Sequence, residues 1–267
     1  MPAKPLRRSP ASPASGRAAV LPRCSAFRVT FQGSRIVVDT PVPARSKPSR
    51  AILVFVRAPE AGAVKTRLAA AIGDDAALRI YRRLAEHTVC EAAALDADGV
   101  QLRLQYTPAD AGDDVRGWLG ARAFYLPQAE GDLGARMEDA FARAFADGAD
   151  QVVIVGSDLP EMSAALLRQA FALLDAHPAV LGPARDGGYY LLGLTRPVGG
   201  VFDGIAWSTP DVLAATIKRF HAAGIEPALL DELGDVDEVE DVPEGWLAEL
   251  SAAEVGRAIP VVKASSR

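Results

Sequence analysis

The sequence contains very little cysteine and histidine. Only two cysteines, Cys24 and Cys90, and three histidines occur among its 267 residues. So few cysteines exclude a cysteine-rich metal site and suit a reducing compartment. No apolar run is long enough to span a membrane, and no apolar signal-peptide segment follows the basic start. We therefore expect a cytoplasmic protein that does not bind membranes.

Two common nucleotide-binding motifs are missing as well. The sequence has neither the Gly-x-x-x-x-Gly-Lys-Ser/Thr loop of P-loop NTPases nor the Gly-x-Gly-x-x-Gly turn of dinucleotide-binding domains. A basic surface stripe is also not expected, because residues 51–267 carry a net charge of −14. This acidic balance argues against nucleic acid as a partner. Small anionic ligands stay possible where local cations or a metal offset the field.

The first fifty residues differ in composition from the rest. They carry ten basic residues and one acid, and they are rich in proline, serine and alanine. This composition predicts a flexible extension, with one possible short hairpin at residues 27–38. A transit peptide is an alternative that ranks below both a flexible extension and a start codon placed too early. We assign no chemistry to the extension.

From residue 51 onward, apolar strand patterns alternate with helical patterns. This order predicts one α/β domain over residues 51–267, with a mostly parallel sheet covered by helices on both faces, which is a Rossmann-like three-layer arrangement. The expected strands cover 51–56, 100–106, 123–126, 151–155, 180–183, 189–194 and 227–230. The expected helices cover 75–95, a segment opened by Thr107-Pro108, 133–146, 163–176, and a last helix from Thr209-Pro210 to 223.

The strand at 151–155 leads directly to an acidic residue. Asp158 follows its carboxyl end, which is the edge of an open α/β sheet where ligands bind. A carboxylate there is suited to holding a divalent metal against a phosphate. The alternative role is to cap the next helix, but Ser163 is the better N-cap residue.

The loop after the first strand carries basic residues. Lys65 and Arg67 occur where the next helical turn should begin, and Arg57 directly follows the strand. Backbone N–H groups at a helix start, with Lys and Arg donors beside them, can bind a triphosphate. Taken alone, Lys65 and Arg67 would be interpreted as ordinary solvated charges.

Two glycine-containing segments are further candidates. In Gln128-Ala-Glu-Gly-Asp-Leu-Gly134, Gln128 could pair with a base edge and Gly131 and Gly134 would allow close approach, although Asp132 could instead cap the following helix. In Arg185-Asp-Gly-Gly188, paired glycines after an acid suggest a backbone close to a ligand, and a tight hairpin is the alternative.

Acidic residues near the end of the chain are the last candidate site residues. Asp235 and Asp237 lie on one face of an extended segment, and together with Asp158 they could form an oxygen-ligand site for Mg²⁺ or Mn²⁺. A solvated acidic stretch is the alternative, since Glu238, Glu240 and Asp241 follow.

Together these segments resemble a known family. The matching motifs are Phe55-Val-Arg-Ala-Pro-Glu-Ala-Gly-Ala-Val-Lys-Thr-Arg-Leu68, Gln128-x-x-Gly-Asp-Leu-Gly-x-Arg-Met137, Gly156-Ser-Asp-Leu-Pro160, Gly182-Pro-Ala-Arg-Asp-Gly-Gly-Tyr-Tyr190 and Ile205-Ala-Trp-Ser-Thr209. In this order, over about residues 51–242, they look like the DUF2064 group of glycosyltransferase-A-like (GT-A-like) proteins, also called CofC-like or nucleotide-diphospho-sugar transferase-like.

The resemblance implies a GT-A-like fold and a role for each motif. Lys65, Arg67 and Asp158 would be catalytic, and Asp158 and Asp237 would bind Mg²⁺ or Mn²⁺. Contacts to the nucleotide and to the acceptor would come from two further sets. The nucleotide set is Arg57, Lys65, Arg67, Gln128, Gly131, Leu133 and Gly134, and the acceptor set is Asp186, Gly187, Gly188 and Trp207.

The resemblance also implies a reaction class. We expect a metal-dependent transferase that joins a nucleoside monophosphate to a small anionic acceptor and releases pyrophosphate, acting as a monomer or homodimer. One alternative is a glycosyltransferase with a nucleotide-sugar donor, and another is a non-catalytic nucleotide-binding regulator. The loop Ala58-Pro-Glu-Ala-Gly62 and the segment Gly188-Tyr-Tyr190 depart from the patterns of related nucleotidyltransferases, which leaves the acceptor open.

Overall fold

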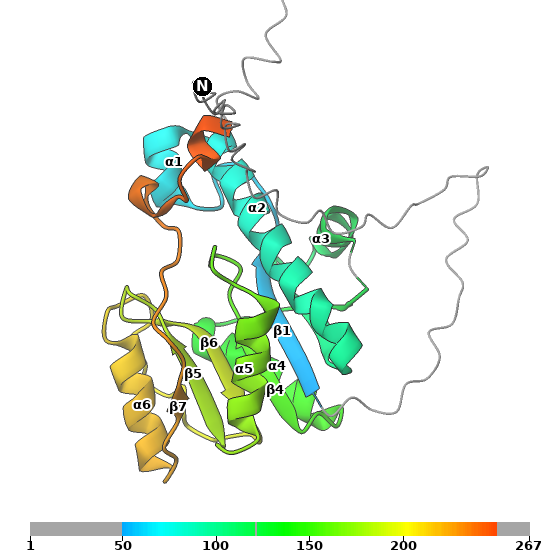
Figure 1. Ribbon diagram of the computed structural model, residues 1–267, viewed down its shortest axis with the longest axis vertical. Helices are drawn as coiled ribbons and strands as arrows, with labels where there is room; N and C mark the ends of the chain where they lie inside the picture. The colour runs from blue at the N-terminus through cyan, green and yellow to red at the C-terminus, as the bar shows by residue number, and fades with distance from the viewer. Residues whose placement is uncertain (1–49, 121, 250–267) are drawn as a thin grey trace, which may run out of the picture. The chain divides into compact units, whose positions relative to one another are not determined.

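The described part of the chain is built around one mixed sheet. The computed structural model describes residues 50–120 and 122–249, so the possible hairpin at 27–38 lies outside it. Seven strands occur in the order β3-β2-β1-β4-β6-β5-β7. Figure 1 labels β1, β4, β5, β6 and β7 of this sheet. Only β6 runs against its neighbours, β4 and β5, while the other pairs are parallel. The expected mostly parallel α/β sheet is confirmed.

The strands match the sequence-based expectation closely. Their bounds are Arg50–Arg57 (β1), Gln101–Thr107 (β2), Phe124–Pro127 (β3), Gln151–Val155 (β4), Ala179–Pro183 (β5), Tyr189–Leu194 (β6) and Ala228–Leu229 (β7). The helices are Thr66–Ile72 (α1), Asp74–Ala93 (α2), Gly112–Leu119 (α3), Leu133–Ala146 (α4), Ala164–Leu174 (α5) and Val212–Ala222 (α6), with short 3-10 helices at Ala94–Asp98 and Val239–Asp241.

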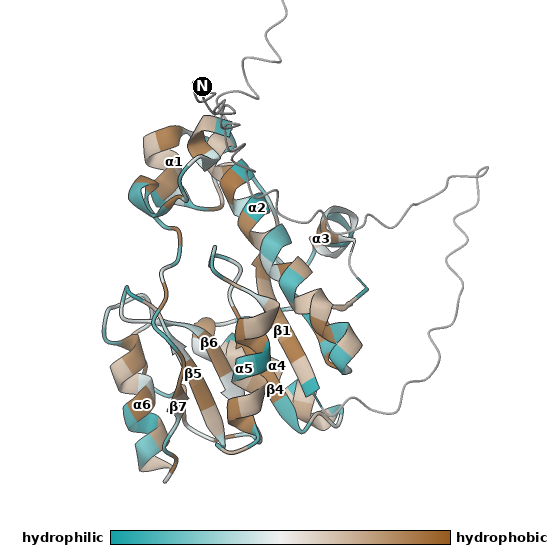
Figure 2. Cartoon of the chain, viewed as in Figure 1, coloured by the Kyte–Doolittle hydropathy of each residue, from teal (hydrophilic) through white to brown (hydrophobic). Residues whose placement is uncertain are grey.

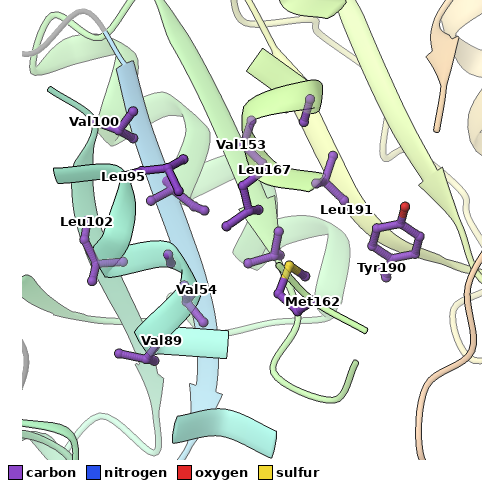
Figure 3. Close-up of a cluster of buried hydrophobic side chains, with 14 of the residues drawn as sticks. Val54, Val89, Leu95, Val100, Leu102, Val153, Met162, Leu167, Tyr190 and Leu191 are labelled. Atoms are coloured by element: carbon purple, nitrogen blue, oxygen red, sulfur yellow. The ribbon is translucent and has the colours of Figure 1, made fainter. Parts of the chain in front are cut away.

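The central strands are buried on both faces, which explains their continuous apolar sequences. In β1, Ile52, Val54 and Val56 point to one core cluster and Ala51 and Leu53 point to the other. The first cluster, shown in Figure 3, packs the sheet against α2, α3 and α5. The second packs it against α4 and α6. These two helical layers and the sheet give the expected three-layer arrangement, and Figure 2 shows the apolar residues concentrated in the strands.

Two predicted helix starts are wrong. Thr107 is the last residue of β2 and α3 begins only at Gly112, so the Thr107-Pro108 pair does not open a helix. The Pro108 carbonyl instead accepts a hydrogen bond from Ala111 N, and α3 begins only after that turn. At the last helix, the Thr209 carbonyl accepts from Val212 N, so a turn again precedes α6. In both cases a local turn occupies the residues that were expected to begin the helix.

The described residues also carry no helix that combines the length and the apolar character needed to cross a membrane.

The N-cap assignment at α5 is confirmed, and it gives a test of local stability. Ser163 has extended backbone angles and its side chain accepts a hydrogen bond from Leu166 N at 3.2 Å. We expect Ser163→Ala to lower the free energy of unfolding by about 1 kcal/mol, because one N–H at the helix start loses its partner. Urea denaturation of the full chain would measure this. Ser163→Asn should retain most of the stability, and an equal loss in both variants would contradict the capping role.

Candidate active site at the carboxyl edge of the sheet

Three segments that are far apart in the sequence meet where β1 and β4 end. The loop after β1 brings Lys65, the loop after β4 brings Asp158, and the segment after β7 brings Asp237. Lys65 Nζ lies 2.7 Å from Asp158 Oδ2 and 3.1 Å from Asp237 Oδ1. We call these three residues the Lys65 cluster. The structure thus brings the predicted phosphate-binding lysine and both predicted metal ligands together.

The lysine is buried, whereas its two partners face solvent. The side chain of Lys65 is 4% exposed and those of Asp158 and Asp237 are each 40% exposed. Burial works to lower the pKa of Lys65, but the two carboxylates outweigh it and hold this pKa above the ordinary value. The ammonium is therefore charged, with part of each carboxylate open to solvent.

The backbone at Lys65 is unusual. Its φ and ψ are 47° and 49°, and among the described residues only Ser208 shares a positive φ without being a glycine. The left-handed region costs an ordinary residue about 1–2 kcal/mol. It places Lys65 immediately before α1 with its ammonium directed at the carboxylates. Such strain is common where a side chain must be held for function.

The position of Asp237 depends on its neighbour. Val236 N donates a hydrogen bond to the Asp158 carbonyl at 3.1 Å, and the Val236 side chain is fully buried. It packs in a small core cluster with residues of α1 and α2, including Leu68 and Ile80. This backbone bond sets the two aspartates side by side. Arg67 is 72% exposed and its Nη1 lies 3.6 Å from Asp237 Oδ2, so it stands at the solvent side of the cluster.

The end of β1 is fixed by a tyrosine that sequence reasoning missed. Tyr81 Oη accepts from Arg57 N at 2.7 Å and donates to the Arg57 carbonyl at 2.8 Å. Burial raises the pKa of Tyr81 to about 12, so the phenol stays neutral. Tyr81 falls at an apolar position of α2, and nothing in the sequence distinguishes it from an ordinary core residue.

The nucleotide-side candidates turn out to have structural partners. Gln128 Nε2 donates to the Gln105 carbonyl at 2.9 Å, so the amide NH₂ group of Gln128 links the residue after β3 to β2. The Asp132 side chain caps α4 by accepting from Ala135 N, which confirms the capping alternative.

The glycines of this segment lie at tight positions. Gly131 has a φ of 108°, and a Cβ on Gly134 would lie 2.7 Å from the Trp207 ring. Leu133 is 45% exposed beside them.

The acceptor-side candidates form a hairpin between β5 and β6. The antiparallel pairing of these strands confirms the hairpin, and Asp186 Oδ1 accepts from Gly188 N at 2.8 Å. Gly187 has a φ of 87°, and a Cβ there would lie 2.1 Å from the Pro210 carbonyl oxygen. Packing against Pro210 therefore accounts for this glycine. The indole Nε1 of Trp207 is buried and has no hydrogen-bond partner.

The Lys65 cluster offers a metal ion the two carboxylates of Asp158 and Asp237, and it does not enclose the ion with protein ligands. Among the residues that the structure describes, no group of three or more His, Cys, Asp or Glu side chains could hold a metal ion. Asp158 and Asp237 nevertheless share one cation already and are open to solvent. Magnesium typically binds through one or two carboxylates, with waters and substrate phosphates completing its shell. The pair fits that kind of metal.

Comparison with known proteins identifies the family. A protein from Desulfovibrio desulfuricans G20, provisionally assigned as a nucleotide-diphospho-sugar transferase, is 34% identical, with a TM-score of 0.69, over 79% of this chain and 99% of its own. The DUF2064 family, described as an uncharacterized protein conserved in bacteria, matches residues 88–209. The chain belongs to the DUF2064 family. Its GT-A-like fold, expected from the sequence, is confirmed by the same relative.

Two further solved structures resemble this DUF2064 protein weakly. The inositol-1-phosphate CTP transferase from T. maritima is 15% identical, with a TM-score of 0.48, over 80% of this chain and 98% of its own. Rv0371c of Mycobacterium tuberculosis H37Rv, in complex with manganese, is 20% identical, with a TM-score of 0.43, over 72% and 95%. This similarity is too low to transfer any property. No curated protein matches the sequence.

The acidic surroundings of the Lys65 cluster give a second prediction. Burial, followed by repulsion from Asp237 and Asp186, raises the pKa of Asp235. A raised carboxyl pKa means that ionised Asp235 destabilises the fold at neutral pH and that the penalty disappears as pH falls below the unfolded-state pKa. We expect Asp235→Asn to raise the melting temperature at pH 7, with the gain fading towards pH 3.

Calorimetry or fluorescence melts at several pH values would measure this gain. The matched control is Glu232→Gln, an exposed carboxylate of the same segment. A gain for Asp235→Asn that matches the control, or one that does not depend on pH, would contradict the repulsion argument.

Proposed function

We propose that this protein is a metal-dependent nucleotidyltransferase that joins a nucleoside monophosphate to a small anionic acceptor. The observation that carries the proposal is the Lys65 cluster, in which an ammonium lies 2.7 Å and 3.1 Å from two carboxylates at the ligand-binding edge of the sheet. Membership in a family of nucleotide-diphospho-sugar transferases supports a nucleotide as the substrate.

In the proposed reaction, an acceptor oxygen attacks the α-phosphorus of a nucleoside triphosphate. A new phosphorus–oxygen bond forms, the bond to the bridging oxygen breaks, and pyrophosphate leaves with the negative charge. Lys65 and Arg67 are the side chains that would stabilise the charge gathering on these phosphates. Mg²⁺ or Mn²⁺ held by Asp158 and Asp237 would supply further positive charge. Tyr81 would keep the end of β1 in place through both of its hydrogen bonds to Arg57.

Electrostatics favours a bound divalent metal at the site. Asp158 and Asp237 contact Lys65, Asp237 also lies near Arg67, and the Asp235 carboxylate interacts with Lys65. These three carboxylates outnumber the two cationic side chains. A nucleotide is itself anionic, so the excess of acid would repel it unless a divalent cation were bound.

Glycosyl transfer from a nucleotide sugar is the second candidate. It is favoured by the assignment of the Desulfovibrio relative to the nucleotide-diphospho-sugar transferases. The two reactions differ in what leaves, since nucleotidyl transfer releases pyrophosphate and glycosyl transfer releases a nucleoside diphosphate. An assay for each product, over a panel of acceptors, separates them.

Ligand-induced thermal shifts test the proposed site before any acceptor is known. We expect at least one nucleoside triphosphate to stabilise the protein, and only when Mg²⁺ or Mn²⁺ is present. A nucleotide at 100 times its dissociation constant should add about 2.7 kcal/mol to the free energy of unfolding. Asp158→Ala should lose this shift. A nucleotide sugar that shifts the protein where triphosphates do not would favour the second candidate, and an unchanged shift in Asp158→Ala would rule out the site.

A lysine substitution tests the metal ligands separately. In Lys65→Met the two carboxylates lose their shared cation, and we expect the free energy of unfolding to fall by about 1–3 kcal/mol, less than for a fully buried pair because both acids are 40% exposed. Mn²⁺ should restore much of this loss, since it can then take the ammonium's position. Denaturation with and without Mn²⁺ measures the effect.

The matched control is Lys218→Met, an exposed lysine on α6. It should be near neutral with and without Mn²⁺. If Mn²⁺ stabilised neither Lys65→Met nor the wild type, Asp158 and Asp237 would not be a metal-binding pair.

A further inference from the structure

A cavity of about 110 Å³ lies at the carboxyl end of β4, the strand whose following loop carries Asp158. Its walls come from the ends of three strands and from the first turns of α4. The lining residues are Phe55 of β1, Leu133 and Met137 of α4, Ile154, Val155 and Gly156 at the end of β4, and Tyr189 to Leu192 of β6. Gly156 is followed directly by Ser157 and Asp158, so the cavity and the proposed metal ligands share one loop.

The lining is apolar. It contains no charged side chain, and its polar side-chain atoms are two tyrosine hydroxyls. The Tyr190 hydroxyl is already used, since it donates to the Asp231 carbonyl at 3.0 Å. A phosphate or a sugar placed here would give up its hydrogen bonds to water without replacement, at a cost of several kcal/mol. An apolar group would lose nothing and would gain by leaving water.

Two further features indicate that a ligand enters here. Leu133, on the cavity wall, is 45% exposed, which is unusual among the described residues, where only Phe124 and Leu229 are comparable large apolar side chains. Next to it, the Trp207 ring packs against Gly134, and its buried indole N–H has no partner. Buried donors are rarely left unpaired in native proteins, so this indole N–H is a polar group whose partner the described residues do not supply.

We infer that the acceptor is amphipathic, with an anionic group joined to an apolar group that fills this cavity. The inference rests on the proposed function, because the anion is taken to lie at Lys65 and the metal carboxylates. A cavity of about 150 Å³ holds benzene, so 110 Å³ corresponds to about four or five carbon atoms. The acceptor class is therefore a phosphate or carboxylate that carries a short alkyl group.

A series of n-alkyl phosphates from methyl to octyl tests this assignment. Their dissociation constants are measured by titration calorimetry on the full chain with Mn²⁺ present, and n-alkyl carboxylates of the same lengths identify the preferred anion. We expect the affinity to rise about threefold to fourfold for each added methylene up to about four or five carbons, and then to level off. A flat series, or one that keeps rising to octyl, would overturn the inference.

A pair of matched variants locates the effect. Ile154→Val removes one methylene from the cavity wall. The chain length at which the affinity stops rising, here called the levelling point, should then increase by about one carbon. Ile52→Val makes the same change in β1 within the opposite core cluster, and it should leave the levelling point unchanged. Equal behaviour of the two variants would also overturn the assignment.

Nucleotide binding by the same samples keeps the two proposals apart. If nucleoside triphosphates shift the melting temperature and the alkyl series is flat, the amphipathic acceptor is wrong and the proposed function stands. If the alkyl series levels off as expected and no nucleotide binds, the cavity assignment stands and nucleotide transfer is wrong.

Discussion

The arrangement of the site depends on one buried charge. An ammonium that is 4% exposed is stable only when opposite charges compensate for its lost hydration, and Asp158 and Asp237 provide them. This need connects three segments that the sheet alone would not hold together: the loop after β1, the loop after β4 and the segment after β7. The hydrogen bond from Val236 N to the Asp158 carbonyl reinforces the same junction. Removing the charge pair would therefore loosen the site before it affected the core.

The sheet supplies the rigidity on which this junction rests. β1 and β4 are adjacent and parallel, and apolar clusters bury them on both faces. Their carboxyl ends are therefore fixed relative to each other, and the loops that follow them start from fixed points. Strain at Lys65, where φ is 47°, is tolerated because both ends of its segment are anchored: Tyr81 holds Arg57 on one side, and α1 packs on α2 on the other. The packing of the fold thus compensates for the unfavourable backbone conformation of Lys65.

Much of the fold follows from local sequence patterns, and the exceptions have physical causes. The strands β4 and β6 and the helix α4 were predicted with their bounds because their apolar periodicity is uninterrupted. Thr107-Pro108 was misread because the same pair suits a helix start and a turn, and only the contacts of the finished fold decide between them.

At the site, Lys65, Asp158 and Asp237 could be proposed from residue type and from family motifs. Tyr81 could not, since its role arises from a contact with Arg57 across 24 positions. Gln128 and Gly187 were given ligand roles, whereas the structure shows partners within the protein for both.

The closeness of an acidic cluster and an apolar cavity affects how the site works. Low local polarity strengthens every charge interaction nearby, which raises both the attraction between Lys65 and its carboxylates and the repulsion felt by Asp235. An apolar group that filled the cavity would exclude water from the start of the loop that leads from Gly156 to Asp158, and would strengthen these interactions further. Charge developing on a phosphate would then be stabilised more strongly with the cavity filled than with it empty. Binding of the apolar group and stabilisation of the reacting phosphates would thus be coupled through the loop from Gly156 to Asp158.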